Sequence, residues 1–218
     1  MKKYILLDLD GTLTNSLEGI GKCLQYALEA FGVSEPDIEA LRCYIGPPLM
    51  DTFMNAYGFS AEQAVAATAK YRERYNTIGW MENEVYDGIK EALERLRAAG
   101  MILIAATSKP ETQAVKIMEY FGLAPYFQDM CGADSDPAAK RNHKDEVIRY
   151  ALEKNNITDK GLVMMVGDTK YDMQGAKQCG IEGLGVLYGF GTKEELEEAG
   201  AALLAETPIQ MAELLLAL

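Results

Sequence analysis

Strand and helix signals alternate along most of this 218-residue chain, and this alternation limits the possible folds more than any other feature. Such an order predicts a parallel sheet with helices on both of its faces, in the α/β class. Strands are expected at residues 4–8, 101–106, 128–132, 162–166 and 184–188, with a weaker sixth at 201–205. Helices are expected between them, including residues 110–121, 144–154, 170–179 and 208–216.

The exception to this alternation is the stretch of more than 90 residues between the first and second strands. A simple crossover does not need that length, so the stretch must contain a second unit. Helical signals at residues 16–31, 38–43, 48–57 and 61–77 predict a small helical bundle, and Asn15 with Glu18 forms a possible capping box at its start. We therefore expect a core of residues 1–14 and 83–218, which contains a further helix at 88–99, and an inserted unit of residues 15–82. The two crossings, near Thr14 and Glu82, are candidate hinges.

Two aspartates, Asp8 and Asp10, directly follow the first apolar run and precede Gly11. Residues i and i+2 of a strand point to the same side, so both carboxylates can reach one reacting centre. Gly11 lets the backbone leave the sheet sharply. An Asp-Gly pair is also a common hairpin signal, and the alternative interpretation is a solvated turn.

Three further polar stretches follow predicted strands or open a predicted helix. Thr107 and Ser108 follow the second strand, Asp168 and Asp172 follow the fourth, and Lys144 opens a helix. In an open parallel sheet, ligands bind beyond the carboxyl ends of the strands. The sequence therefore predicts that these side chains meet Asp8 and Asp10 in one crevice.

The ordered motifs resemble those of the haloacid dehalogenase superfamily, and in particular its phosphoglycolate-phosphatase-like branch. The resemblance rests on residues 8–13 (DLDGTL), 107–110 (TSKP), a separate lysine, and 166–172 (VGDTKYD), and it covers essentially the whole chain. It implies a Rossmann-like core with an inserted α-helical cap. It also implies a Mg²⁺-dependent phosphatase of small phosphomonoesters such as phosphoglycolate, a nucleoside 5'-monophosphate or a sugar phosphate.

The resemblance also assigns roles to residues. Asp8 is expected to be the nucleophile that forms an aspartyl-phosphate, and Asp10 the general acid and base. The phosphoryl group is expected to contact Gly11, the Thr107 hydroxyl, the Ser108 amide and the Lys144 ammonium group.

The metal is expected to lie between the Asp8 carboxylate, the backbone carbonyl of Asp10, and Asp168. Asp172 is expected either to bind the metal or to support its ligands, because residues four apart lie on one helix face. A solvated surface acid is the alternative interpretation of Asp172.

Two assignments are less direct. Lys140 and Arg141 are alternatives to Lys144, which we prefer because it opens the apolar face of its helix. In the expected cap, residues 41–49 resemble the loop that closes over the active site, with Arg42 and Gly46 as candidate substrate contacts. A solvated arginine is an equally good interpretation of Arg42.

Composition restricts the possible partners. The net charge of −12 disfavours nucleic acid and anionic membranes, and no segment has the apolar length of a membrane span. Four scattered cysteines suggest neither a zinc site nor a disulfide framework, and they are expected to be buried apolar residues. His143, the only histidine, is expected to be a solvated neighbour of Lys144. We therefore expect a cytoplasmic monomer or homodimer that acts on a small phosphorylated metabolite.

Two other functions remain open. A phosphomutase resembling beta-phosphoglucomutase shares the aspartate pair and the cap, although residues 107–110 look more like the phosphatase branch. A phospho-receiver signalling domain also groups aspartates, threonine and lysine on an α/β sheet. Receivers, however, lack a helical insertion after the first strand and carry their phosphorylated aspartate later in the chain.

Overall fold

The computed structural model describes residues 2–134 and 141–218, which form two compact units. One unit comprises residues 1–14 and 85–218, and the other comprises residues 15–84. The second crossing between them therefore lies two residues later than the sequence predicts. At the crossings, the short strands β2 (Thr14–Asn15) and β3 (Glu84–Val85) pair with each other.

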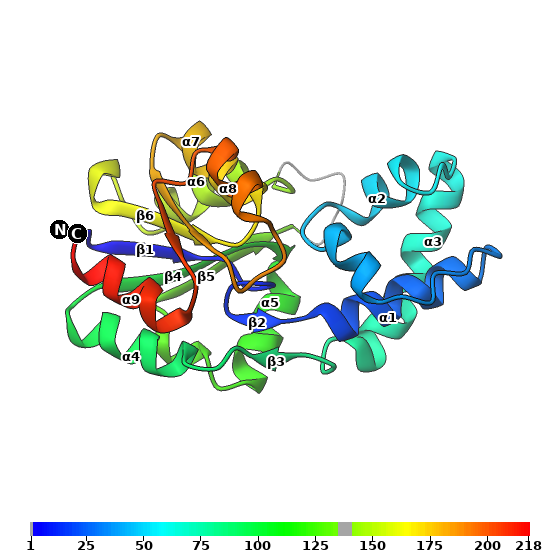
Figure 1. Cartoon of the computed structure of the whole chain (residues 1–218), viewed down its shortest axis with the longest axis horizontal. Coiled ribbons are helices and arrows are strands. Elements are labelled where there is room, and N and C mark those ends of the chain that lie inside the picture. The colour runs from blue at the N-terminus through cyan, green and yellow to red at the C-terminus, as the bar shows by residue number, and fades with distance from the viewer. Residues whose placement is uncertain (1, 135–140) are drawn as a thin grey trace. The chain divides into compact units, whose positions relative to one another are not determined.

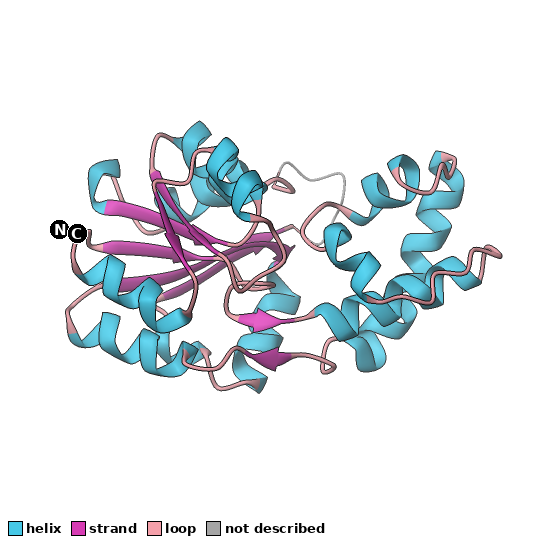
Figure 2. Ribbon diagram, viewed as in Figure 1, coloured by secondary structure: helices cyan, strands magenta, loops and turns pink. Residues whose placement is uncertain are grey.

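The first unit is built on a six-stranded sheet in the order β5-β4-β1-β6-β7-β8 (Figures 1 and 2). Every neighbouring pair of strands in it is parallel. The strands are β1 (Tyr4–Leu7), β4 (Ile102–Pro110), β5 (Asp129–Ala133), β6 (Val163–Gly167), β7 (Glu182–Val186) and β8 (Leu203–Ala205). β1 lies at the centre, and its last residue, Leu7, is in register with Ala105 of β4 and Val166 of β6.

Helices cover both faces of this sheet, so the predicted α/β class is confirmed (Figure 2). They are α4 (Ile89–Ala98), α5 (Glu111–Tyr120), α6 (Lys144–Lys154), α7 (Lys170–Cys179), α8 (Lys193–Ala199) and α9 (Pro208–Leu216), with short 3₁₀ helices at Ala124–Tyr126 and Lys160–Leu162. Helices α6 and α7 pack together on one face, and α4 packs with α9 on the other (Figure 1).

The core between the sheet and helices α6 and α7 is apolar and closed to solvent. Leu6 and Met165 from the sheet contact a layer that includes Val147, Ile148 and Ala176 from the helices. Strands buried on both faces are expected to be continuously apolar, and the run Ile5–Leu7 has this composition. This packing holds the carboxyl ends of β1, β4 and β6 in a fixed register.

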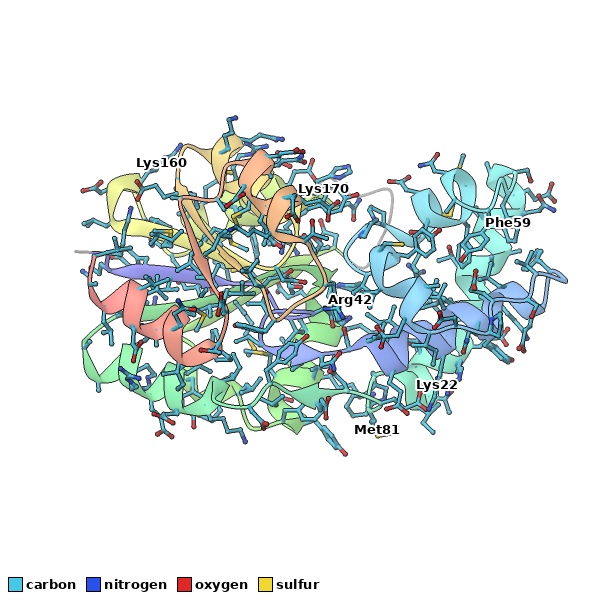
Figure 3. All side chains as sticks on the ribbon, viewed as in Figure 1. Lys22, Arg42, Phe59, Met81, Lys160 and Lys170 are labelled. Carbon is cyan, nitrogen blue, oxygen red and sulfur yellow. The ribbon has the colours of Figure 1, made fainter. Side chains whose placement is uncertain are left out.

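The second unit is built from helices. It contains α1 (Leu17–Glu29), a 3₁₀ helix (Glu39–Tyr44), α2 (Leu49–Asn55), α3 (Ala61–Arg74) and a π-helical turn (Tyr75–Gly79). The ring of Phe59, labelled in Figure 3, contacts the rings of Phe31, Phe53 and Tyr57, and of these four side chains Phe53 is fully buried while the others are partly buried. At the packing of α1 on the π-helical turn, a side chain on Gly19 would overlap the Gly79 carbonyl, so the close approach requires glycine.

Some local expectations were wrong. The capping box of Asn15 and Glu18 does not form, because Asn15 bonds to Leu17 N and Glu84, while Glu18 pairs with Lys22. Ser16 occupies the cap position instead. Cys43 is exposed, although the other three cysteines are buried as expected. Within the described ranges, no helix has the length and apolar character to cross a membrane.

Candidate active site

The first group of site residues lies where β1 ends. The backbone N–H of Asp8 donates to the carbonyl of Val166 (3.0 Å), which extends the parallel ladder by one residue. The N–H of Leu9 then donates to Asp8 Oδ1 (2.8 Å), and Gly11 turns the chain away from the sheet with a φ of 79°. The result is a nearly buried carboxylate at the edge of the sheet where ligands bind in open α/β folds.

Asp8, Asp168 and Asp172 form a cluster of buried acids. One carboxylate oxygen from each lies within 4.8 Å of the others. Asp168, just after β6, accepts hydrogen bonds from Thr12 Oγ1 (3.1 Å) and Phe190 N (2.8 Å). The alternative interpretation of Asp172 as a surface acid is wrong, because its side chain is completely buried.

Asp172 lies in the first turn of α7, where its Oδ2 accepts hydrogen bonds from the Thr169 N–H (3.0 Å) and hydroxyl (2.9 Å). A carboxylate at a helix N-terminus satisfies free backbone donors and interacts favourably with the helix dipole. The spacing of four residues between Asp168 and Asp172 therefore serves both the start of the helix and the acid cluster.

Lys144 supplies a buried positive charge to this cluster. Its Nζ lies 2.9 Å from Asp8 Oδ2 and 2.6 Å from Asp172 Oδ1, and it donates to the Ala106 carbonyl (3.1 Å). Burial alone would lower the pKa of Lys144, but Asp172 and Asp8 together raise it above its ordinary value. This lysine is therefore a permanently charged partner of both acids.

The cluster contains more negative than positive charge. Burial raises the pKa of Asp8, with Lys144 opposing the shift and Asp172 adding to it. Burial, Asp172 and Asp8 raise the pKa of Asp168 well above its ordinary value. Three buried carboxylates beside one ammonium group form an all-oxygen donor set with uncompensated charge, which fits a hard divalent cation such as Mg²⁺.

Glycines surround the acids closely, and those of residues 189–191 were missed by sequence reasoning. A side chain on Gly11, Gly189 or Gly191 would overlap Asp168, and one on Gly167 would overlap Asp172. The only signal for the residue 189–191 segment is its Gly-Phe-Gly sequence after β7, which indicates a tight turn but no partner.

Asp10 lies outside the acid cluster and has a different partner. Its Oδ2 accepts a hydrogen bond from Lys109 Nζ at 2.6 Å. Its Oδ1 is buried and has no hydrogen-bond partner within the described part of the chain. The carboxylate of Asp10 thus does not join Asp8, Asp168 and Asp172, and a metal contact through its backbone carbonyl remains a prediction.

Thr107 lies buried at the carboxyl end of β4, and Ser108 follows it half-buried. The Thr107 hydroxyl accepts a hydrogen bond from Lys109 N (3.2 Å). The register between β4 and β5 shifts between Thr107 and Pro110, and such irregularities re-aim side chains next to active sites. Sequence reasoning assigned no role to Lys109, which the irregular segment directs to Asp10.

The other predicted contacts lie elsewhere. Arg42 belongs to the helical unit, where it is 41% exposed and pairs with Glu39 at 3.8 Å (Figure 3). Gly46, in the same unit, has a φ of 109°. Their proposed contacts with substrate remain predictions.

The alternatives to Lys144 have other surroundings. Arg141 pairs with Asp134 at 2.9 Å, whereas Lys140 lies outside the described residues. His143 is exposed, and its backbone N–H donates to Glu146 at the start of α6.

Known proteins resemble this chain over most of its length. A 5'-nucleotidase of Pseudomonas aeruginosa is 43% identical over 192 residues, which cover 88% of this chain and 86% of that protein. Tyrosine-protein kinase PtkA of Mycobacterium tuberculosis is 35% identical, covering 92% of this chain and 67% of the kinase. A phosphoglycolate phosphatase of Vibrio parahaemolyticus is 28% identical, covering 97% of this chain and 95% of that protein.

A solved structure has the same fold. The crystal structure of a predicted phosphatase from Clostridium acetobutylicum superposes with a TM-score of 0.95 at 41% identity, covering 100% of both chains. The model of the haloacid dehalogenase-like hydrolase family matches residues 5–186, which include most of β1, all of β4 and β6, and all three acids of the cluster. This chain therefore belongs to the haloacid dehalogenase-like hydrolase family.

Proposed function

We propose that this protein is a phosphatase that hydrolyses small phosphomonoesters through a phosphorylated Asp8. The observation that carries the proposal is the contact of Lys144 with both Asp8 and Asp172 inside a buried acid cluster. A carboxylate held beside a fixed positive charge, at the end of a buried strand, is positioned to attack a phosphorus atom rather than to stabilise the core. The names of the 43% and 28% identical relatives support hydrolysis of a phosphomonoester.

In the first step, a carboxylate oxygen of Asp8 attacks the phosphorus, and the bond from phosphorus to the ester oxygen breaks. Asp10 gives its proton to the departing alcohol. In the second step, a water molecule attacks the phosphorus, and Asp10 takes a proton from that water molecule. The bond from phosphorus to the Asp8 oxygen then breaks, and inorganic phosphate leaves.

Fixed donors around Asp8 offset the repulsion between this carboxylate and the substrate dianion. Lys144 is the strongest of them, because it is charged and buried. The Thr107 hydroxyl and the Ser108 amide lie at the end of the adjacent strand and are proposed to bind the phosphoryl oxygens. The turn after Asp10 requires glycine at position 11, because the positive φ there disfavours any other residue.

The acids of the cluster fit a resident Mg²⁺ ion. Asp8, Asp168 and Asp172 would hold it, and its charge would neutralise the substrate dianion when bound. The buried surplus of negative charge supports this assignment, since buried charges require compensation. The oxygen-only donor set favours magnesium over zinc.

The substrate class is proposed from the comparisons. A nucleoside 5'-monophosphate is the first candidate, because the 43% identical relative is named 5'-nucleotidase. Phosphoglycolate and sugar phosphates follow. The helical unit is proposed to act as the cap that selects among them, and a cytoplasmic location agrees with such metabolites.

The test is phosphate release from a panel of nucleoside 5'-monophosphates, phosphoglycolate and sugar phosphates, with Mg²⁺ and with chelator. We expect turnover that needs Mg²⁺ and is lost in Asp8→Asn, with Asp129→Asn as a control at the opposite end of the sheet. Conversion between sugar phosphate isomers without phosphate release would indicate a phosphomutase instead. Because one relative is named a tyrosine-protein kinase, incubation with ATP and a tyrosine peptide completes the panel, and phosphotyrosine without ester hydrolysis would overturn the proposal.

A further inference from the structure

The pairing of Lys109 with Asp10 is not explained by phosphate binding. Lys109 Nζ lies 2.6 Å from Asp10 Oδ2, and the two side chains are only 8% and 13% exposed. Removing two charges from water is costly, so an ion pair at that depth adds little net stability to the fold. Its presence is better explained by a second role. Most other ion pairs of this unit involve more exposed side chains, such as Lys170 with Glu195 on α7 and α8 (Figure 3).

The local backbone directs Lys109 to this position. A regular strand would continue the alternation of sides from Thr107 onward, but the ladder with β5 shifts register between Thr107 and Pro110. The Thr107 hydroxyl accepts the Lys109 N–H at 3.2 Å and holds the bend. Gly132 of β5 lies against it, because a Cβ there would be 2.7 Å from the Lys109 carbonyl oxygen.

Asp10 has two inequivalent carboxylate oxygens as a result. Lys109 holds Oδ2, whereas Oδ1 is buried and has no hydrogen-bond partner within residues 2–134 and 141–218. A buried oxygen without a hydrogen-bond partner costs free energy in the protein without substrate. Such an atom is often satisfied only when a ligand binds. A carboxylate clamped at one oxygen presents the other in a defined direction.

We propose that Lys109 is a positioning residue that aims Asp10 Oδ1 at the leaving-group oxygen of the substrate. The inference rests on the proposed function, in which Asp10 is the general acid. Lys109 holds the Asp10 carboxylate in one rotamer, so that the proton on Oδ1 passes to the ester oxygen as its bond to phosphorus breaks. Proton transfer requires hydrogen-bond reach, and loss of this aim therefore slows protonation of the leaving group.

The leaving group provides the test. p-Nitrophenolate leaves without a proton, whereas the more basic phenolate benefits from protonation as it departs. Rapid-mixing measurements of the first turnover of p-nitrophenyl phosphate and phenyl phosphate, with Mg²⁺ present, isolate this step from hydrolysis of the aspartyl-phosphate. For Lys109→Met we expect release of phenol to slow by about 10- to 100-fold, part of the general acid contribution, while release of p-nitrophenol slows less than about threefold.

One further variant restores the positive charge at position 109, and another serves as a control. Lys109→Arg keeps a positive charge within reach of Asp10 and should recover most of the rate of phenol release. Lys154→Met is the matched control, because Lys154 pairs with Asp129 at 2.8 Å at the amino end of β5, and it should leave both rates unchanged. If Lys109→Met does not fold, Lys109→Gln, a polar side chain of similar length without the charge, carries the test through the same difference between the two esters, which a merely structural role would not produce.

The outcomes separate the two levels of the proposal. Equal slowing of both esters, or a higher KM for both at unchanged kcat, would mean that Lys109 binds phosphate or supports the fold, and would overturn the positioning role while the phosphatase stands. If the parent protein releases neither phenol nor p-nitrophenol from the two esters and no phosphate from the metabolite panel, the proposed function itself fails.

Discussion

Replacing Asp168 by asparagine should stabilise the metal-free protein while abolishing its activity. The side chain is fully buried, and its carboxylate lies within 4.8 Å of those of Asp8 and Asp172. At that separation and an effective dielectric constant of roughly 20, each pair of like charges repels by about 3 kcal/mol. The substitution removes two such repulsions.

The hydrogen bonds of Asp168 survive this change. Asparagine keeps one oxygen to accept from Phe190 N, and its amide donates to Thr12 Oγ1, since a hydroxyl both donates and accepts. Protonation of Asp168 already relieves part of the repulsion in the parent protein. We therefore expect a net gain of about 1 to 3 kcal/mol in the free energy of unfolding, within the range found when buried charges are replaced. In a chain of this length the gain raises Tm by roughly 3 to 10 °C.

The gain should depend on pH in a defined direction. Burial, Asp172 and Asp8 raise the pKa of Asp168 above its value in the unfolded chain, so the folded protein holds this proton more tightly. The favourable contribution of that proton is complete below about pH 4 and is lost as the pH rises through the folded pKa. The difference in Tm between Asp168→Asn and the parent should therefore be small near pH 4 and widen toward neutral pH.

The assay is thermal unfolding of both proteins in chelator and in Mg²⁺, alongside phosphate release. Saturating Mg²⁺ at roughly 100 times its Kd should stabilise the parent by about 3 kcal/mol but shift the variant much less. Asp129→Asn is the matched control, because it removes a partly exposed acid paired with Lys154 and should respond to Mg²⁺ like the parent. A variant that melts at or below the parent in chelator at neutral pH, or that gains the full Mg²⁺ shift, would refute the reasoning.

Three further predictions concern the same site, and a fourth concerns Arg42 of the helical unit. Asp8→Asn should abolish turnover with the fold intact, because an amide is a poor nucleophile, and initial rates with circular dichroism check both; activity within about tenfold of the parent contradicts the covalent role. Lys144→Met should lower the free energy of unfolding in chelator by about 3 to 5 kcal/mol, because it leaves two buried acids without their positive partner. Denaturant titration measures this loss, and an unchanged unfolding midpoint would contradict the prediction. Ca²⁺ should inhibit phosphate release in competition with Mg²⁺, since Ca²⁺ accepts longer bonds and a higher coordination number, and rates at fixed Mg²⁺ with increasing Ca²⁺ test this. Full activity in excess chelator would refute metal dependence. Arg42→Ala should raise KM for the anionic metabolite far more than for p-nitrophenyl phosphate, and equal losses of kcat/KM on both would exclude Arg42 from specificity.

The architecture could be predicted because its signals are local and repeated. Apolar strands alternate with amphipathic helices, and a parallel sheet is the arrangement that buries both. The same regularity exposes the inserted unit, because the segment between β1 and β4 breaks the alternation. The details that were wrong depend on competition between nearby partners. Glu18 could bond either to the helix cap at Asn15 or to Lys22 one turn later, and in the structure it bonds to Lys22.

The candidate site was partly predictable for a similar reason. Carboxyl ends of parallel strands meet at one edge, so Asp8 and Asp168 could be brought together from their places in the sequence alone. Whether Asp172 was a surface acid or a member of the cluster could not be decided from its spacing. Asp172 pairs there with Lys144, which comes from a different helix and could not be matched to it by local pattern.

The sequence by itself determined the α/β class, the inserted helical unit and the chemical types of the site residues, because these follow from periodicity, from strand ends and from short motifs. Only the tertiary structure decided which charges pair. Lys109 and Asp10 are 99 positions apart, and Phe190 reaches Asp168 across 22. Such contacts depend on where a register shift or a glycine turn aims a side chain, and that aim is set by the packing of neighbouring strands rather than by any local pattern.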